Sequence, residues 1–153
     1  MMNRVALALV IVGFLGCCFA QEKKETVSVQ FRLGETEPGP GLKEMSVPGS
    51  DRKVYLHERV ELSNEDIASA SVRMRENGPI KEPIIEMTFT EEGGEMLRRV
   101  TRENTGKILA IVVDGKVLTA PVIASPIGGG KCVITGSFTM DEAKRIADGL
   151  CGK

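Results

Sequence analysis

The stretch Ala110–Ile123 reads AIVVDGKVLTAPVI, and it decides how the chain folds back on itself. Two apolar runs rich in β-branched residues flank the dipeptide Asp114-Gly115. Asp-Gly suits the two central positions of a type I′ turn, which both need positive φ, so the pattern predicts a β-hairpin. The step Ala120-Pro121 interrupts the second run. Because proline lacks an N–H, this step predicts a sheet edge or a bulge.

The glycines that follow, Gly128–Gly130, stand directly before Lys131 and raise the question of a phosphate site. A phosphate-binding loop needs G-x-x-x-x-G-K-[ST] between a strand and a helix, so that backbone amides surround the anion. Here Ser125 stands at the first glycine position and Cys132 at the Ser/Thr position, and a β-type run follows. The sequence therefore predicts a turn between strands.

Alternating or continuous apolar runs predict the strands of the hairpin and those around it. These strands are Thr26–Leu33, Lys53–His57, Val72–Glu76, Pro83–Phe89, Ile108–Val113, Lys116–Ile123 and Lys131–Phe138. Between the first two, Glu35–Ser50 is dense in Pro and Gly, which predicts a loop.

Three helices are predicted from start and stop signals. They are a short one over about Asn64–Ala70, one that opens at Thr90-Glu91-Glu92 and stops at Gly106, and one that follows the capping box Thr139–Glu142 and ends before Gly152. These elements predict an α+β fold, with a single mostly antiparallel or mixed β-sheet and about three helices packed mainly on one face.

The N-terminal sequence predicts that the chain is exported from the cytoplasm. Val5–Ala20 is an apolar run, shorter than the about 20 residues that cross a bilayer, and Cys18-Phe19-Ala20 suits a signal peptidase. The predicted organisation is a signal peptide over 1–20, a polar lead over 21–26 and one domain over 27–150. An alternative is a lipobox with Cys17 as the acylated residue, although Phe14 is unusual at its first position. An uncleaved short anchor ranks third.

Cleavage after Ala20 would leave Cys132 and Cys151 in the mature chain. Two thiols in an oxidising compartment favour a disulfide between them. The alternative is two buried free cysteines that act as small apolar side chains.

Composition and motifs argue against several functions. A net charge of -1 and only 4% aromatic residues indicate no nucleic-acid partner. His57 is the single histidine, in a sequence that resembles H-E-x-x-H with Glu61 replacing the second histidine, so neither a zinc site nor a His-based triad is expected. We expect no catalytic residues, no metal and no cofactor, and we interpret Asp114 as a turn residue.

An ordered set of motifs resembles the first periplasmic domain, including its head subdomain, of the protein-export membrane protein SecD and its SecDF fusion. The motifs are EPGPGL (Glu37–Leu42), VPGS (Val47–Ser50), VYLH (Val54–His57), NEDIASASV (Asn64–Val72), EMTFTEEGGEML (Glu86–Leu97), VTRENTGKILAIVVDGKVLTAPVI (Val100–Ile123), GGG (Gly128–Gly130), ITGSFT (Ile134–Thr139) and EAKRIADGL (Glu142–Leu150).

The resemblance implies an exported, periplasmic or extracellular, non-enzymatic domain that binds unfolded or extended polypeptide or export-machinery proteins. It is expected as a free-standing copy without the membrane motor and with no membrane span in the mature chain, but with a lipid anchor if Cys17 is acylated. The expected contact surface is an open sheet edge together with a loop. The loop is Pro38–Gly49, and its named residues are Pro38, Gly39, Pro40, Gly41, Pro48 and Gly49. The alternative is an ordinary surface loop. Other functions left open are an envelope binding protein or small lipoprotein unrelated to export, and a small envelope hydrolase.

Overall fold

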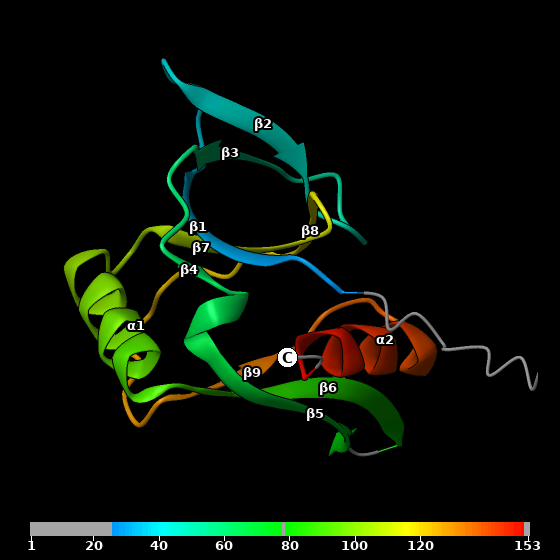
Figure 1. The fold of residues 1–153 in the computed structure, drawn as a ribbon. Coiled ribbons are helices and arrows are strands. Elements are labelled where there is room, and N and C mark those ends of the chain that lie inside the picture. The colour runs from blue at the N-terminus through cyan, green and yellow to red at the C-terminus, as the bar shows by residue number, and fades with distance from the viewer. Residues whose placement is uncertain (1–25, 78, 152–153) are drawn as a thin grey trace, which may run out of the picture.

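The chain forms two antiparallel sheets and two α-helices in a computed structural model that describes residues 26–77 and 79–151 (Figure 1). The six-stranded sheet contains β1 (Val29–Glu35), β2 (Leu42–Ser46), β3 (Lys53–His57), β4 (Leu62–Ser63), β7 (Ile108–Val113) and β8 (Lys116–Thr119). The three-stranded sheet contains β5 (Ile67–Asn77), β6 (Ile80–Phe89) and β9 (Lys131–Ile134). The α-helices are α1 (Glu91–Glu103) and α2 (Met140–Leu150).

The six-stranded sheet has the order β2-β3-β1-β7-β8, with β4 added to β1. The sheet curls strongly, so that its two edge strands, β2 and β8, come near one another (Figure 1). The curled sheet encloses a small apolar cluster that consists of Val54, Leu56, Ile108, Ala110, Val112, Val117 and Ala120. Because the curled sheet buries its own inner face, this face needs no covering layer of helices or strands.

The main core lies between the two sheets and is closed by both helices. Strand β7 is buried at every position, because its alternate residues serve different cores. Leu109, Ile111 and Val113 face the main core, whereas the residues between them face the enclosed cluster. The uninterrupted apolar run Ile108–Val113 therefore reflects a strand that is covered on both faces.

The hairpin predicted from Asp114-Gly115 is confirmed. Asp114 has a φ of 48° and Gly115 a φ of 78°, and Val113 pairs with Lys116 across the turn. Strand β8 ends at Thr119, earlier than the predicted Ile123, and the register shifts once along its pairing with β7. The end of β8 directly before Ala120 agrees with the interruption expected at Ala120-Pro121, whereas the register shift lies earlier, between Val117 and Thr119.

The third predicted helix, over Asn64–Ala70, is wrong. Its capping box does form, because Ser63 N–H donates to Asp66 and the Ser63 side chain caps the turn. However, only a single 3₁₀ turn (Asn64–Asp66) follows before the chain extends into β5 at Ile67. An antiparallel pairing of ten residue pairs with β6 outweighs a weak local helix signal in a segment rich in Ser and Ala.

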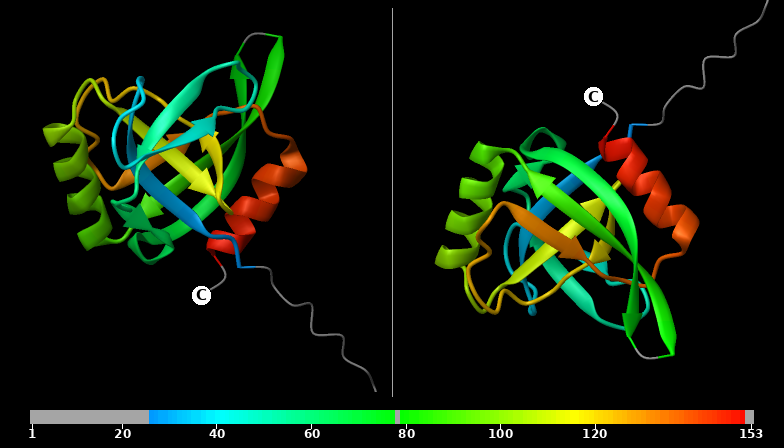
Figure 2. Two further views of the ribbon diagram at one scale, coloured as in Figure 1. Left: turned by 90° about the horizontal axis from the view of Figure 1, so that it is seen from above. Right: turned by 90° about the horizontal axis from the view of Figure 1, so that it is seen from below.

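Two further expectations need correction. The sheet is not single, and the two helices lie on opposite sides of the molecule, as Figures 1 and 2 show, with α2 packed on β5 and β6. The predicted loop Glu35–Ser50 contains strand β2, which pairs residue by residue with β3. Its prolines and glycines are confined to the turns on either side, where they interrupt no ladder hydrogen bond.

Candidate binding surface

The residues expected to contact a partner form two turns that flank the edge strand β2. Pro38–Gly41 makes the first turn, in which Leu42 N–H donates to Gly39 O over 3.2 Å and Gly41 has a φ of 72°. Pro48-Gly49 makes the second turn, in which Ser50 N–H donates to Val47 O. Apart from Gly39, the six expected residues are exposed. The structure therefore presents the expected loop residues together at the two ends of one open strand.

A groove, here called the β2 groove, runs along this strand. One wall is formed by Lys43–Ser46 and Pro48, and the other by Gly115–Val117 of the β7–β8 hairpin. Its volume is about 450 Å³. A smaller hollow of about 240 Å³ shares Pro48, Lys116 and Val117 with it and continues toward α2. The volume of the β2 groove, though not that of the smaller hollow, falls within the range of ligand-binding clefts.

Sequence reasoning included one wall of the β2 groove and missed the other. It placed Lys43–Ser46 and Pro48 within the predicted contact loop Pro38–Gly49, but it did not recognise the segment as a strand. It also had no means to place Lys116 and Val117 opposite this segment, since only the curvature of the sheet brings them there. The one available signal was the apolar spacing of Met45 and Val47 within an otherwise polar stretch.

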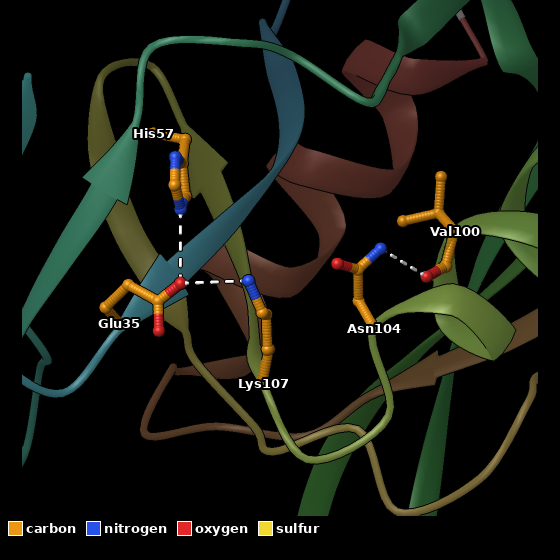
Figure 3. A network of polar contacts seen from close by, with 5 residues as sticks. All are labelled: Glu35, His57, Val100, Asn104 and Lys107. Carbon is orange, nitrogen blue, oxygen red and sulfur yellow. Dashed lines mark hydrogen bonds and ion pairs between the residues drawn. The ribbon is translucent and has the colours of Figure 1, made fainter.

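A polar network lies at the C-terminal end of β3, where His57 is located (Figure 3). Glu35, the last residue of β1, accepts from His57 Nε2 over 3.3 Å and from Lys107 Nζ over 3.2 Å. The hydrogen bond from His57, followed by that from Lys107, lowers the pKa of the Glu35 carboxyl. Nearby, Asn104 Nδ2 donates to Val100 O and caps α1. The network joins β1, β3 and the start of β7, and it gives His57 a structural partner at a strand end.

Asp114 is likewise occupied by structural contacts. Its carboxylate accepts from Ser28 N–H over 2.9 Å and from Arg145 Nη1 over 3.0 Å. The Ser28 backbone hydrogen bond, and then the Arg145 hydrogen bond, lower the pKa of this carboxyl. Asp114 thus joins the hairpin turn to the segment before β1 and to α2, which agrees with its interpretation as a turn residue.

The triple glycine is a close-packed turn before β9. Gly129 and Gly130 have φ values of 77° and 62°, and Gly130 O accepts from Phe89 N–H. A Cβ added to Gly94 at the start of α1 would lie 3.1 Å from Gly130 Cα. A phosphate-binding loop leads directly into a helix whose N-terminus faces the anion. Here strand β9 follows directly, which agrees with the predicted turn before a strand.

Cys132 and Cys151, the cysteines within the described residues, are free thiols in the structure. Cys151 Sγ contacts the backbone of Ala70 at the outer edge of β5, whereas Cys132 pairs with Met87 of β6 on the other side. Strands β5 and β6 therefore lie between them, and two strand spacings of about 4.8 Å each exceed the Cα separation of a disulfide. Burial raises the pKa of the Cys132 thiol to about 11, which keeps it protonated. A Cys132–Cys151 disulfide would need rearrangement and stays a prediction for thiol titration.

Other sequence-based expectations concern metal ions and the membrane. Within residues 26–77 and 79–151, no group of three His, Cys, Asp or Glu side chains could hold a metal ion. In the same residues, no helix is both long enough and apolar enough to span a bilayer. The predicted signal peptide, its cleavage site and Cys17 lie outside the described residues.

Comparisons with known proteins give a consistent result. The chain is 45% identical over 86 residues to the protein translocase subunit SecDF of Thermus thermophilus, covering 56% of this chain and 11% of that protein. It is 38% identical over 98 residues to the protein translocase subunit SecD of Syntrophobacter fumaroxidans, covering 64% of this chain and 18% of that protein. The chain thus spans under a fifth of the length of these relatives.

Solved structures agree with the sequence relatives. A crystal structure of SecDF in its super-membrane-facing form matches 84% of this chain and 19% of the other with a TM-score of 0.66 at 30% identity. A structure of SecDF, described as a membrane component that enhances protein export, matches 84% of this chain and 63% of the other with a TM-score of 0.65. The family model for the SecDF P1 head subdomain matches residues 42–151. On these grounds the chain belongs to the SecDF P1 head family.

Proposed function

We propose that this chain acts outside the cytoplasm in protein translocation by binding extended polypeptide or a protein of the export machinery. The observation that carries the proposal is the family membership of residues 42–151, which include the edge strand β2 and one of the two exposed turns that flank it. An open strand edge can take up a further strand from another polypeptide through main-chain hydrogen bonds. The relatives are named translocase subunits, but this chain covers only a small part of them, so their whole activity is not transferred to it.

A binding role is favoured over catalysis because the candidate polar groups already have structural partners. Asp114 is held by Ser28 and Arg145, and Glu35 is shared by His57 and Lys107. A general base must instead lie within hydrogen-bond reach of the proton that it removes from the substrate. A flat result in a broad hydrolase substrate screen is the expected outcome, and turnover of any ester or peptide substrate would contradict the proposal.

Fluorescence anisotropy with a labelled, reduced and alkylated secretory protein tests whether the chain binds unfolded polypeptide. We expect saturable binding to the wild-type chain and weaker binding to a variant that replaces Pro38, Pro40 and Pro48 by serine. The matched control replaces Pro121 and Pro126, which lie outside the two turns, by serine. No measurable binding at high micromolar concentration would defeat the claim that the chain holds polypeptide.

Binding to proteins of the export machinery and the cellular location of the chain need separate measurements. Recovery of translocon components from an envelope extract by the tagged chain would support a role in export, whereas their absence would favour an envelope protein unrelated to export. We propose an exported location with cleavage after Ala20. N-terminal sequencing that begins at Gln21 would support this cleavage, and a lipid-modified Cys17 would establish the lipoprotein alternative.

A further inference from the structure

The free edge of β2 presents hydrogen-bonding groups to the β2 groove. Val47 N–H donates to Arg52 O over 2.9 Å, in the same register as the β2–β3 pairing. Because hydrogen-bonded and non-hydrogen-bonded pairs alternate along an antiparallel ladder, Met45 also bonds toward β3. Glu44 and Ser46 then direct their N–H and C=O groups away from β3. Within the described part of the chain, no backbone or side-chain group pairs with them.

The β2 groove beside these groups has an apolar interior. Met45 and Val117 lie on its two walls; Val117 belongs to the cluster enclosed by the curled sheet, and Met45 packs against that cluster. Beyond Pro48, the smaller hollow adds the side chains of Phe138 and Ile146. A strand laid along β2 would alternate its side chains between this apolar interior and solvent. The groove therefore suits an extended segment with an apolar residue at every second position.

The charges of the β2 groove walls set a second requirement. Glu44 is neutralised by Lys53, whose Nζ lies 2.7 Å from the carboxylate. Lys43 and Lys116 are exposed, and in the described residues neither of them forms an ion pair. The uncompensated charge on both walls is therefore positive. Complementary charge favours an occupant that carries carboxylates beside its apolar residues.

The open edges of the three-stranded sheet, β5 and β9, are less suited to this role. At β5, the backbone of Ala70 is already contacted by Cys151 Sγ, and α2 packs against the strand. The distal part of β5 carries Arg73 and Arg75, which pair with glutamates of β6 and leave no uncompensated charge there. Strand β9 is only four residues long. Of these three edges, only that of β2 combines unpaired backbone groups with an apolar groove and uncompensated charge.

We propose that β2 is a strand-addition site for an extended polypeptide segment with alternating apolar residues flanked by Asp or Glu. The segment pairs with the backbone of Glu44 and Ser46, places apolar side chains against Met45 and Val117, and directs its carboxylates toward Lys43 and Lys116. This inference rests on the proposed polypeptide-binding function and specifies its site and its ligand.

Three fluorescein-labelled synthetic peptides of about nine residues test the proposed ligand class. All contain alternating Val and Thr; one is flanked by Glu, one by Lys, and one is Glu-flanked with two Val replaced by Pro. The Glu-flanked peptide should bind at least about fivefold more tightly than the Lys-flanked peptide, and this ratio should shrink at high salt. The proline peptide should bind at least about tenfold more weakly, because it cannot complete the ladder. Equal affinities for all three peptides would overturn the proposal.

Hydrogen exchange of the complex locates the peptide. The Glu44 and Ser46 amides should exchange more slowly in the complex, while the Val72 and Met74 amides on β5 should be unchanged. Protection of β5 alone would show that the site is wrong although polypeptide binding holds. If neither the peptides nor the alkylated secretory protein binds, the proposed function fails as well.

Variants separate charge from backbone pairing. Ser46→Pro removes one edge N–H and should weaken the Glu-flanked peptide about tenfold. Because this change could disturb β2 itself, the double variant Lys43→Glu/Lys116→Glu is a second test. It should reverse the preference toward the Lys-flanked peptide, whereas the control Lys131→Glu/Lys144→Glu, with the same charge change at exposed sites outside the β2 groove, should not. An unchanged preference in the first double variant would overturn the proposed charge recognition.

Discussion

Asn64 attaches the first strand to the rest of the fold through its side-chain amide. Its Oδ1 accepts from Val29 N–H over 2.6 Å, and its Nδ2 donates to Val27 O over 2.5 Å. One side chain thus satisfies two backbone groups of a segment whose neighbouring side chains, Val27 and Val29, are fully buried. Nothing in the sequence distinguished this asparagine from a residue at a helix start, because its partners lie far away along the chain.

Replacing Asn64 by alanine should therefore lower the free energy of unfolding by about 1–3 kcal/mol, since two part-buried backbone groups lose their partners. Urea denaturation measures this loss. Asn104→Ala, which removes a single amide bond to Val100 O at the end of α1, is the matched control and should cost less. Equal costs for the two variants would show that Asn64 does not anchor the first strand.

Gly149 in α2 permits close contact with the same segment. A Cβ at this position would overlap Val27 Cγ2 and would lie 2.7 Å from Val27 Cβ. Helix propensity alone favours alanine over glycine by about 1 kcal/mol. We expect overpacking to exceed this gain, so that Gly149→Ala lowers stability by up to about 2 kcal/mol in thermal or urea unfolding. Gly128→Ala, where an added methyl meets no atom within 4 Å, should be nearly neutral. A stabilised Gly149→Ala would contradict the contact with Val27.

Asp114 should make stability depend on pH in the acidic range. Its folded-state pKa lies below its ordinary value of 3.8, because the carboxylate accepts from Ser28 N–H and Arg145. A depressed carboxyl pKa contributes stability that is fully present above the unfolded pKa and is lost as pH falls through the folded pKa. Asp114→Asn should therefore melt at a lower temperature than wild type at neutral pH.

The difference in melting temperature should then shrink as the pH falls below 3.8, because protonation removes from the wild-type Asp114 the negative charge that asparagine lacks at every pH. Arg145→Gln removes only one of the two contacts and should show a smaller loss over the same pH window. Melting curves followed by circular dichroism between neutral and strongly acidic pH measure both variants. A difference that does not vary with pH would assign the effect to turn geometry alone.

Helix α1 is joined to the long connection before β9 by one buried hydroxyl. Thr101 is fully buried; its Oγ1 donates to Leu97 O over 2.7 Å and accepts from Ile127 N–H over 2.9 Å. Thr101→Val keeps the shape but leaves the Ile127 amide without its partner, which should cost about 1–2 kcal/mol. Faster hydrogen exchange of the Ile127 amide is the specific signature. In Thr105→Val, which removes bonds only to carbonyls of its own helix, this amide should be unaffected.

Elements with complete local signals were predictable from sequence, and those that depend on a distant partner were not. The β7–β8 turn needs two positive φ values, which Asp-Gly supplies, and α2 has a capping box and an apolar stripe within its own residues. In contrast, β5 begins with a valid helix cap but pairs along its length with β6. Strand β2 stands between turn residues, so its pairing with β3 determines its conformation.

The same distinction explains what was predicted of the binding surface. The turn residues around β2 carry their own signal in Pro and Gly, and they do lie on the surface. The groove wall at Lys116 and Val117 depends on how far the six-stranded sheet curls, and this curvature arises from the packing of residues such as Leu56 and Val112. A groove formed by two distant edges of one sheet leaves no motif in the sequence.

At the scale of the whole molecule, the two sheets contact one another through an aromatic pair. Phe31 of β1 and Phe89 of β6 meet edge to face, with ring centroids 5.6 Å apart, and both side chains are buried. The main core around them includes residues from both sheets and both helices. A core shared in this way predicts that the two sheets unfold together in one cooperative transition.

A double-mutant cycle on Phe31→Leu and Phe89→Leu measures this contact directly. Each single variant should be destabilised, because a buried aromatic ring is exchanged for a smaller side chain. The coupling free energy should be about 0.5–1.5 kcal/mol, as for other edge-to-face pairs. Phe31 and Phe138, which are not paired as aromatic rings within the described residues, form the control cycle and should show a smaller coupling. A coupling near zero for Phe31 and Phe89, or separate unfolding transitions detected by different probes, would mean that the sheets are joined by α1 and α2 more than by their own faces.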